Sequence, residues 1–247
     1  MAVRRHKRAF VSCLFASLSL VLFASPAPAV SFDDDLTRQL ARSAPNINRD
    51  VLQAALQATQ CAVRNGVEEP ERLAVIDFSL PSTERRLWIF DLAKGELLMR
   101  ELVAHGKNSG LNRATEFSNT VNSYQSSIGL FRASESYQGK HGYSLRLDGL
   151  EEGINDRARE RAIVIHGADY VDPSWIREHG RLGRSHGCPA VRQGVVQKVV
   201  NTLKGGQLVF KYYPEQRWLQ SSWYLHCDEP QLASRDFDQR RREHREL

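Results

Sequence analysis

The sequence is poor in sulfur-containing residues and has only one long apolar run. It has four cysteines and two methionines in 247 residues. The apolar run, residues 9–24, follows the basic stretch 4–8 and precedes "SPAPAV", with small residues at Ala27 and Ala29. This order is typical of a secretory signal peptide cut after Ala29, and an uncleaved anchor is the alternative. We therefore expect an exported protein of the periplasm or cell envelope, with no stable membrane span after cleavage.

The expected mature chain also lacks a net charge of one sign. Removing Arg4, Arg5, Lys7 and Arg8 from the 34 lysines and arginines leaves 30, against 29 acidic residues, so the formal net charge is +1. A basic patch is the electrostatic footprint of nucleic-acid binding, and the overall charge gives no support for one. We predict no nucleic-acid partner, and we find no internal repeat. The oligomeric state is not predicted.

The pattern of apolar residues divides the chain into four segments. We predict a signal peptide at 1–29, a helical N-terminal segment at 30–70, a catalytic domain at 71–228 and a charged tail at 229–247. The helical segment ends at "NG" and contains a helix that Asn48 can cap. Strand patterns then dominate, at 73–80, 86–92, 96–106, 130–150 (a hairpin with "QGKHG" at its bend), 161–167 and 207–213.

Two features break this run of strands. Residues 106–129 are rich in Ser, Asn and Gly and predict a long loop, a kind of segment that is often functional. Valines and Leu203 at helical spacing predict a helix ending at Gly205–Gly206. The sequence therefore predicts a mainly β protein with a helical N-terminal lead and few short helices.

The stretch "GRLGRSHGCPAVR", residues 180–192, places Cys188 among glycines and cations. A thiolate is favoured by nearby cations, a helix N-terminus or a histidine, and Arg181 and Arg184 precede the cysteine closely. Glycine lets a backbone approach a substrate, so the amides of Gly187 and Cys188 are candidates for an oxyanion hole. These features predict a nucleophilic cysteine, with a small buried apolar residue as the alternative.

A cysteine nucleophile needs a general base that is held rigidly. His166 lies at the end of the short apolar run "RAIVIHG", which predicts a buried strand with this histidine at its tip. His186 lies only two residues from Cys188, a separation that does not assure a proton-transfer geometry. We therefore predict His166 as the base and keep His186 as the alternative.

These two stretches, "IVIHG" and "GRLGRSHGCPAVR", resemble the signature of the L,D-transpeptidase catalytic domain (YkuD-type). Further stretches such as "LVAHGKNSG" and "YQSSIGLF" are similar to one exported bacterial branch of it, so the resemblance covers roughly residues 73–213. It implies an L,D-transpeptidase-like β-sandwich and a cysteine acyl-enzyme formed from a tetrapeptide stem of peptidoglycan. An amine acceptor then takes the acyl group. No cofactor and no metal is implied.

The resemblance also implies roles for individual residues. Cys188 matches the nucleophile, His166 the base, and Gly167 the group whose carbonyl orients that histidine. The residues that match the oxyanion and loop positions are Ser185, His186 and Gly187.

The sequence departs from the family pattern in two places. Eighteen residues separate His166 from Ser185, and "DPSWIREHG" can absorb the excess as a helix with Asp172 as its cap, Pro173 in its first turn and a terminal glycine. Ala190 stands where many relatives carry an arginine. The cation that binds the substrate carboxylate is therefore left open among Arg184, Arg181 and Arg192.

Several alternative functions stay open at this stage. Water as the acceptor would make the protein a cell-wall L,D-carboxypeptidase. A cysteine endopeptidase, a non-catalytic peptidoglycan-binding module and a zinc site of His166, His186 and Cys188 are the others.

Two cysteines remain besides the nucleophile. Cys61 lies late in the N-terminal helix and Cys227 follows the last strand. An oxidising compartment permits them to form a disulfide that closes a loop of more than a hundred residues. Two unpaired buried cysteines are the alternative.

Overall fold

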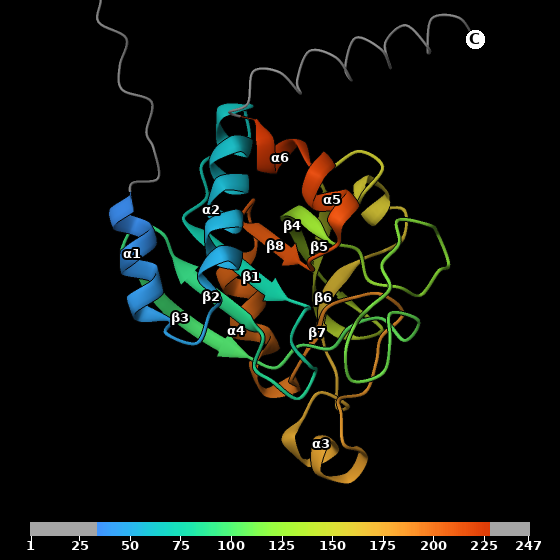
Figure 1. Cartoon of the computed structure of the whole chain (residues 1–247). Helices are drawn as coiled ribbons and strands as arrows, with labels where there is room; N and C mark the ends of the chain where they lie inside the picture. Colours follow the sequence, from blue (N-terminus) through green and yellow to red (C-terminus); the bar gives the residue numbers. More distant parts are fainter. Residues whose placement is uncertain (1–33, 228–247) are drawn as a thin grey trace, which may run out of the picture. The chain divides into compact units, whose positions relative to one another are not determined.

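The computed structural model describes residues 34–227. The predicted signal peptide at 1–29 and the charged tail at 229–247 lie outside this range. No helix in the described part is long and apolar enough to cross a membrane. Figure 1 shows the elements in chain order. They are α1 (Asp34–Ser43), α2 (Arg49–Arg64), β1 (Arg72–Asp77), β2 (Leu87–Asp91), β3 (Glu96–Glu101), β4 (Gly129–Gly139), β5 (Gly142–Gly149), η1 (Asp156–Ala158), β6 (Val164–Gly167), α3 (Pro173–His179), β7 (Ala190–Val191), α4 (Gln193–Leu203), β8 (Leu208–Tyr212), α5 (Gln216–Ser221) and α6 (Trp223–His226).

The described strands form one eight-stranded sheet in the order β3-β2-β1-β8-β4-β5-β6-β7. β1 pairs with β8 and β6 with β7 in parallel, and the remaining pairs are antiparallel. The late strand β8 therefore lies at the centre of the sheet, between the early strand β1 and the β4–β5 hairpin. The mainly β fold with a helical lead and few short helices, predicted from the sequence, is confirmed.

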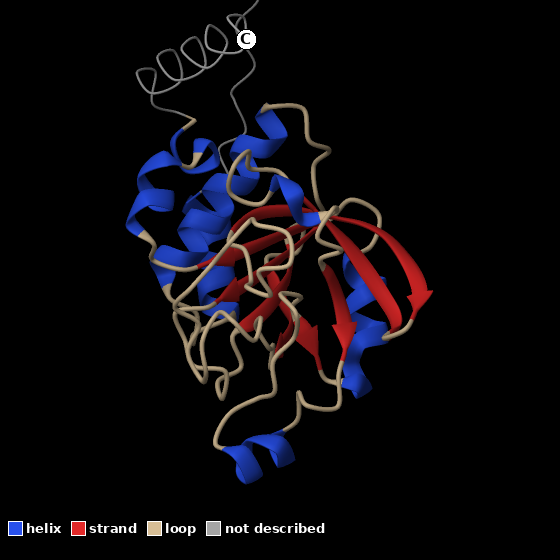
Figure 2. Cartoon of the chain, turned by 90° about the vertical axis from the view of Figure 1, so that its right-hand side faces the viewer, coloured by secondary structure: helices blue, strands red, loops and turns tan. Residues whose placement is uncertain are grey.

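Helices cover the sheet on both sides, as Figure 2 shows. Alternating residues of β1 divide between two cores, because successive side chains of a strand point to opposite faces. Leu73 and Val75 pack in the core that includes α2. Ala74 and Ile76 pack in the core that includes α4 and the inner residues of β5 and β6. We call this second cluster the α4-side core.

The predicted helical N-terminal segment contains two helices, α1 and α2. Pro45 lies in the break between α1 and α2, where a proline is tolerated because no helical hydrogen bond is required of it. Asn48 caps α2 as predicted, and its side chain accepts a hydrogen bond of 2.8 Å from the amide of Asp50. The buried residues of α2 then hold the lead against the sheet.

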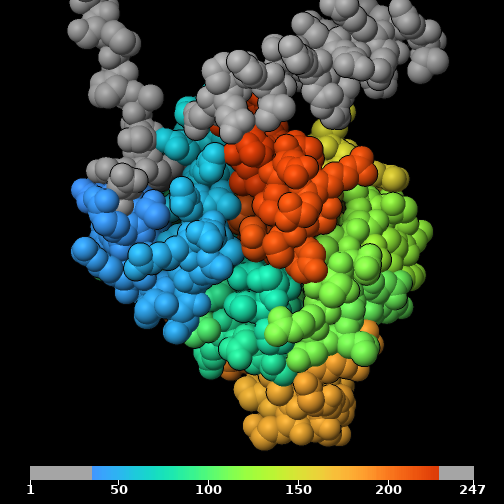
Figure 3. All heavy atoms as spheres, in the orientation of Figure 1, coloured from blue at the N-terminus to red at the C-terminus, as the bar shows by residue number. Residues whose placement is uncertain are grey.

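The insert before Ser185 contains the short helix predicted for it. Asp172 caps α3 and accepts a hydrogen bond from the amide of Ser174, Pro173 opens the helix, and Gly180 ends it with φ of 69°. No residue of α3 is fully buried. Figure 3 shows this segment projecting at one end of the molecular surface.

Two predicted strands are shorter than the sequence suggested. β1 ends at Asp77 and β3 at Glu101. Beyond β3 the chain stays extended and makes only isolated pairings, Ala104 with Ala190 and Gly106 with Ser185. These pairings carry the start of the long polar loop to the segment that contains Cys188.

Candidate active site

Cys188 lies in the turn just before β7, beside the edge of β6. The amide of Val164 in β6 donates to the Cys188 sulfur at 3.5 Å, and the sulfur lies 3.7 Å from the carbonyl oxygen of Ala162. The side chain is partly exposed and is the free cysteine of the described chain. A thiol in this place is both reachable from solvent and held by the backbone of a neighbouring strand.

Glycine at position 187 is required by the backbone. Gly187 has φ of 116°, and a Cβ there would lie 2.7 Å from the carbonyl oxygen of Gln125. Gly106 is equally restricted, since a Cβ on it would collide with the carbonyl of Tyr124 and approach the Cα of Gly187 to 2.9 Å. Three backbone segments, from residues 106, 124–125 and 187, thus cross in direct contact next to Cys188.

Ser185 fixes the turn that carries the cysteine. Its hydroxyl donates to the Cys188 carbonyl at 2.6 Å and accepts from the Gly187 amide at 3.0 Å. The amide of Gly187 is therefore occupied, whereas the amide of Cys188 has no hydrogen-bond partner among residues 34–227. Of the two amides expected to hold an oxyanion, the geometry favours that of Cys188.

His166 lies in β6, on the strand beside Cys188. In the parallel register His166 is opposite Ala190, which places Cys188 two residues before that position. The ring is 3 % exposed, and its Nδ1 lies 2.9 Å from the carbonyl oxygen of Gly167. If Nδ1 carries the proton and donates to this carbonyl, Nε2 is the basic nitrogen. Burial lowers the pKa of His166, so the neutral, basic form persists to lower pH.

The groups that act most strongly on the pKa of Cys188 lie on other segments of the chain. Burial raises the pKa of the thiol, and the Val164 amide and the charges of Lys211, Arg161 and Lys140 oppose this rise. Arg181 and Arg184, the cations expected from their sequence proximity, are not among these groups. Their guanidiniums donate instead to the backbone carbonyls of Leu182, Lys107 and Gly110, and their activation of the thiol stays a prediction.

The three candidate arginines are used in holding the loops. Arg184 donates to the carbonyls of Lys107 and Gly110 at 2.9 and 3.0 Å. Arg181 donates to the carbonyl of Leu182 at 2.8 Å. Arg192 makes a two-pronged ion pair with Glu101, at 2.7 and 3.0 Å.

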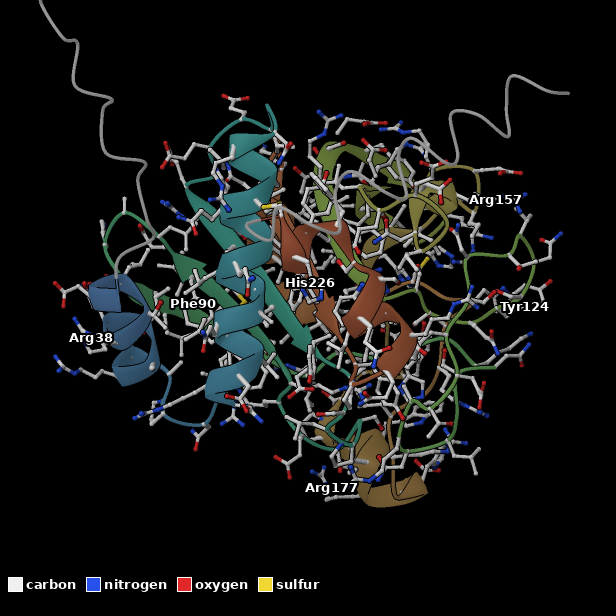
Figure 4. The ribbon with its side chains drawn as sticks, turned by 45° about the horizontal axis from the view of Figure 1, so that its top comes forward. Arg38, Phe90, Tyr124, Arg157, Arg177 and His226 are labelled. Atoms are coloured by element: carbon white, nitrogen blue, oxygen red, sulfur yellow. A yellow bond between two sulfur atoms is a disulfide. The ribbon has the colours of Figure 1, made fainter. Side chains whose placement is uncertain are left out.

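A partly exposed cation, Lys107, lies next to His186 of the cysteine turn. The Lys107 ammonium is 4.2 Å from the ring centroid of Tyr124 and 3.4 Å from Nε2 of His186. The Tyr124 and His186 rings are 4.6 Å apart. Tyr124 holds a left-handed backbone conformation with φ of 55°, a form that is uncommon outside glycine and often marks a functional site. Figure 4 shows Tyr124 on the side of the long loop, away from Arg38 of α1.

Arg161 was missed at the sequence level. Its guanidinium donates to the carbonyls of Ser118 and Gln125, both at 2.5 Å, and thereby ties the long loop to the chain just before β6. No spacing pattern marks this residue, because its partners lie about forty positions earlier in the chain.

His105 has a structural role. It is buried against Arg86, and its burial together with the charge of Arg86 lowers the pKa of His105 to about 3.

A metal site is not supported by the arrangement of the ligand-type side chains. Within residues 34–227, no group of three or more His, Cys, Asp and Glu residues is placed to hold a metal ion. His186 turns toward Lys107 and Tyr124, whereas His166 is held by Gly167. The geometry is therefore that of a thiol beside a fixed histidine.

The two cysteines that were predicted to form a disulfide lie on α2 and after α6, away from β6 and the cysteine turn. Cys61 in α2 and Cys227 after α6 form a disulfide with their Cα atoms 6.1 Å apart. This bond joins the helical lead to the end of the described chain.

The chain was compared with models of known protein families and with curated proteins. The family model of the L,D-transpeptidase catalytic domain matches residues 43–212. None of the curated proteins compared with the chain matches it.

Solved structures that resemble the chain do so at low identity. An L,D-transpeptidase from Mycobacterium smegmatis is 15 % identical with a TM-score of 0.36, over 58 % of this chain and 59 % of that one. An L,D-transpeptidase from Stackebrandtia nassauensis is 13 % identical with a TM-score of 0.36, over 72 % and 76 %. The alignments thus span less than two thirds of the M. smegmatis structure and most of the S. nassauensis one.

Proposed function

The chain belongs to the L,D-transpeptidase catalytic domain family, and from this premise we propose that it is a peptidoglycan L,D-transpeptidase with Cys188 as its nucleophile. The observation that carries the proposal is the pairing of β6 with the cysteine turn. One strand supplies both the amide that holds the Cys188 sulfur and the histidine whose Nδ1 is fixed by Gly167. A thiol in the turn before β7 and a fixed histidine on the neighbouring strand β6 suit acyl transfer.

The first half-reaction forms a thioester. His166 Nε2 takes the thiol proton, and the sulfur attacks the carbonyl carbon of the third residue of a tetrapeptide stem. The oxyanion that develops is placed near the free amide of Cys188. When it collapses, the peptide C–N bond breaks and the terminal D-alanine leaves as an amine with the proton from His166.

The second half-reaction transfers the acyl group to an amine. The acceptor nitrogen attacks the thioester carbon and gives its proton to His166. The C–S bond then breaks, and the proton returns to the sulfur. The burial that raises the pKa of Cys188 keeps the resting nucleophile as a thiol, so a base is required in each cycle.

The substrate carboxylate needs a cation near the cysteine turn. The charge of Arg192 is already paired with the Glu101 carboxylate, whereas Arg184 and Arg181 contact only backbone carbonyls. Arg184 and Arg181 are therefore the better candidates to bind the substrate carboxylate. Lys107 is a further candidate, because its ammonium is partly exposed beside His186. Export to the periplasm or cell envelope is part of the proposal and follows from the signal-peptide pattern at 1–29.

One experiment tests the reaction and its alternatives together. The purified mature protein is incubated with a disaccharide-tetrapeptide and analysed by mass spectrometry for the acyl-enzyme and products. A thioester on Cys188 and a cross-linked dimer support the proposal. A tripeptide without the dimer indicates an L,D-carboxypeptidase, and cleavage at another bond an endopeptidase. Binding with no product and no acyl-enzyme indicates a binding module and overturns the proposal.

A further inference from the structure

Lys211 is a lysine in the interior of the protein. It lies in β8 at the centre of the sheet (Figure 1), opposite Gly129 of β4 and Ile76 of β1. Its side chain is 0 % exposed, and its Nζ has no hydrogen-bond partner among the described residues. A buried amine without a hydrogen bond destabilises a fold, whereas an apolar residue of similar length would pack there at no such cost.

The side chain points into the α4-side core. Leu208 and Phe210 of β8 pack on the α2 side, and Val209 packs on the α4 side. Because side chains alternate along a strand, Lys211 shares the face of Val209. Its Nζ lies 3.5 Å from the ring centroid of Phe131, another member of the α4-side core.

Cys188 is partly buried and packs against this same core. The charged form of Lys211 and the ionised form of Cys188 attract each other, and Arg161 acts on both groups. The Val164 amide and the charge of Lys140 in the β4–β5 turn also act on the pKa of Cys188, and the charge of Cys188 acts on the pKa of Tyr170 after β6. His166 lies on the adjacent strand.

We propose that Lys211 is a positioning residue for the nucleophile: its protonated amine, enclosed in the α4-side core, stabilises the thiolate of Cys188 from the protein interior. A thiolate on an exposed surface is stabilised by water, and at this site the core replaces water on one side. An ammonium in the core restores part of that stabilisation. The ionised pair and the neutral pair hold the same number of protons, so the two groups titrate together.

The shifts in the pKa values of Lys211 and Cys188 agree with their enclosure in the same core. Burial lowers the pKa of Lys211 well below its ordinary value and raises that of Cys188, while each charge partly offsets the effect on the other. Ionising either group therefore favours ionising its partner. The inference rests on the proposed function only in taking Cys188 as the nucleophile.

The test measures thiol reactivity without peptidoglycan, so that its failure is separate from failure of the proposed activity. The rate of Cys188 alkylation by iodoacetamide is followed against pH in the wild type, Lys211→Met and the matched control Lys198→Met. Lys198 is an exposed lysine of α4. We expect the alkylation midpoint of Lys211→Met to move up by about one pH unit, the effect of removing a nearby charge in a protein interior.

The control and the thermal midpoint separate this role from a structural one. Lys198→Met should keep the wild-type profile. Lys211→Met should unfold at the same or a higher temperature than the wild type, because it removes a buried amine. An unchanged alkylation midpoint in a folded Lys211→Met protein would overturn the proposal.

A reciprocal measurement needs no change at Lys211. The titration of the Lys211 side chain is followed by NMR in the wild type and in Cys188→Ser. Loss of the thiolate should lower the pH at which Lys211 titrates, because coupling between two sites acts equally on both. Identical lysine titrations in the two proteins would contradict the inference even if Lys211→Met did not fold.

Discussion

The ring of His141 stacks on the ring of His166, with centroids 4.6 Å apart and planes at 29°. His141 is exposed and lies at the tip of the β4–β5 hairpin, so this tip covers the proposed base. Burial is the main cause that lowers the pKa of His166, and the charges of His141 and Lys140 lower it further. The tip of the β4–β5 hairpin thus lowers the pKa of His166 and favours its neutral form.

Removing the stacked ring should narrow the active pH range. In His141→Ala, His166 is less buried and loses a repelling charge, so its pKa rises toward the ordinary value. The base works in its neutral form, so activity is lost as pH falls through this pKa. The acid limb of the kcat/KM–pH profile should therefore move to higher pH. His141→Phe keeps the cover without the charge and should show a smaller shift; equal profiles in all three proteins would contradict this role.

Cys188→Ala should abolish acyl transfer and leave the fold intact, because no other thiol of the described chain is free. Product formation is measured by mass spectrometry, and folding by circular dichroism. By family resemblance, a carbapenem should add its mass to the wild type at Cys188 and leave the variant unmodified. Wild-type product formation by the folded variant, or an adduct mapped elsewhere, would refute the assignment.

His166→Gln should lower the rate by roughly 10²- to 10⁴-fold, the usual contribution of a general acid–base group. His186→Ala is the matched comparison. His186 is exposed and contacts Tyr124 and Lys107, so its loss should affect substrate binding more than the chemical step. Steady-state kinetics on both variants decides the roles, and a larger loss of kcat in His186→Ala would reverse them.

Gly187→Ala should reduce activity much more than Gly205→Ala. Both positions have positive φ, so alanine costs each about 1–2 kcal/mol of backbone strain. Only at Gly187 does the added Cβ meet a fixed backbone oxygen, whereas nothing lies within 4 Å at Gly205. Overpacking adds about 1–3 kcal/mol of destabilisation and displaces the cysteine turn. Similar thermal midpoints and rates in the two variants would show that the turn tolerates a side chain.

The oxidised, denatured mature protein should show a single reactive thiol, that of Cys188, because Cys61 and Cys227 are bonded. Reduction should expose three thiols. The disulfide spans a sequence separation of 166, for which the chain-entropy model gives about 5 kcal/mol, so the reduced protein should unfold at lower denaturant concentration. Three thiols before reduction would exclude the bond in solution.

Local signals allowed the sequence to predict much of the scaffold. The Asn48 cap, the Asp172-Pro173 start of α3 and its Gly180 end are each determined by neighbouring residues, and the structure has all three. The order of the sheet was beyond prediction, because β8 enters between β1 and β4 through pairings that span most of the chain.

The same distinction applies to the site. Cys188 and His166 are recognisable from short motifs, and the structure places them on neighbouring elements. The cations near the sulfur are not recognisable. The charges of Arg161 and Lys211 act on the pKa of Cys188 from other segments, and "QLVFKYY" resembles an ordinary strand with one polar position. Charge proximity within a core depends on tertiary packing, which one sequence does not display.

The contact of backbone with backbone at Gly106, Tyr124–Gln125 and Gly187 has a consequence for protein engineering. These segments meet without intervening side chains, so none of them can be transplanted from a homologue or redesigned by itself. The long polar loop carries two of these segments, so a graft of this loop would also have to bring a matching version of the third, the segment at Gly187. Directed evolution of acceptor choice is therefore better started at the partly exposed Lys107 and the exposed His141, whose side chains can be varied while the three backbone segments stay unchanged.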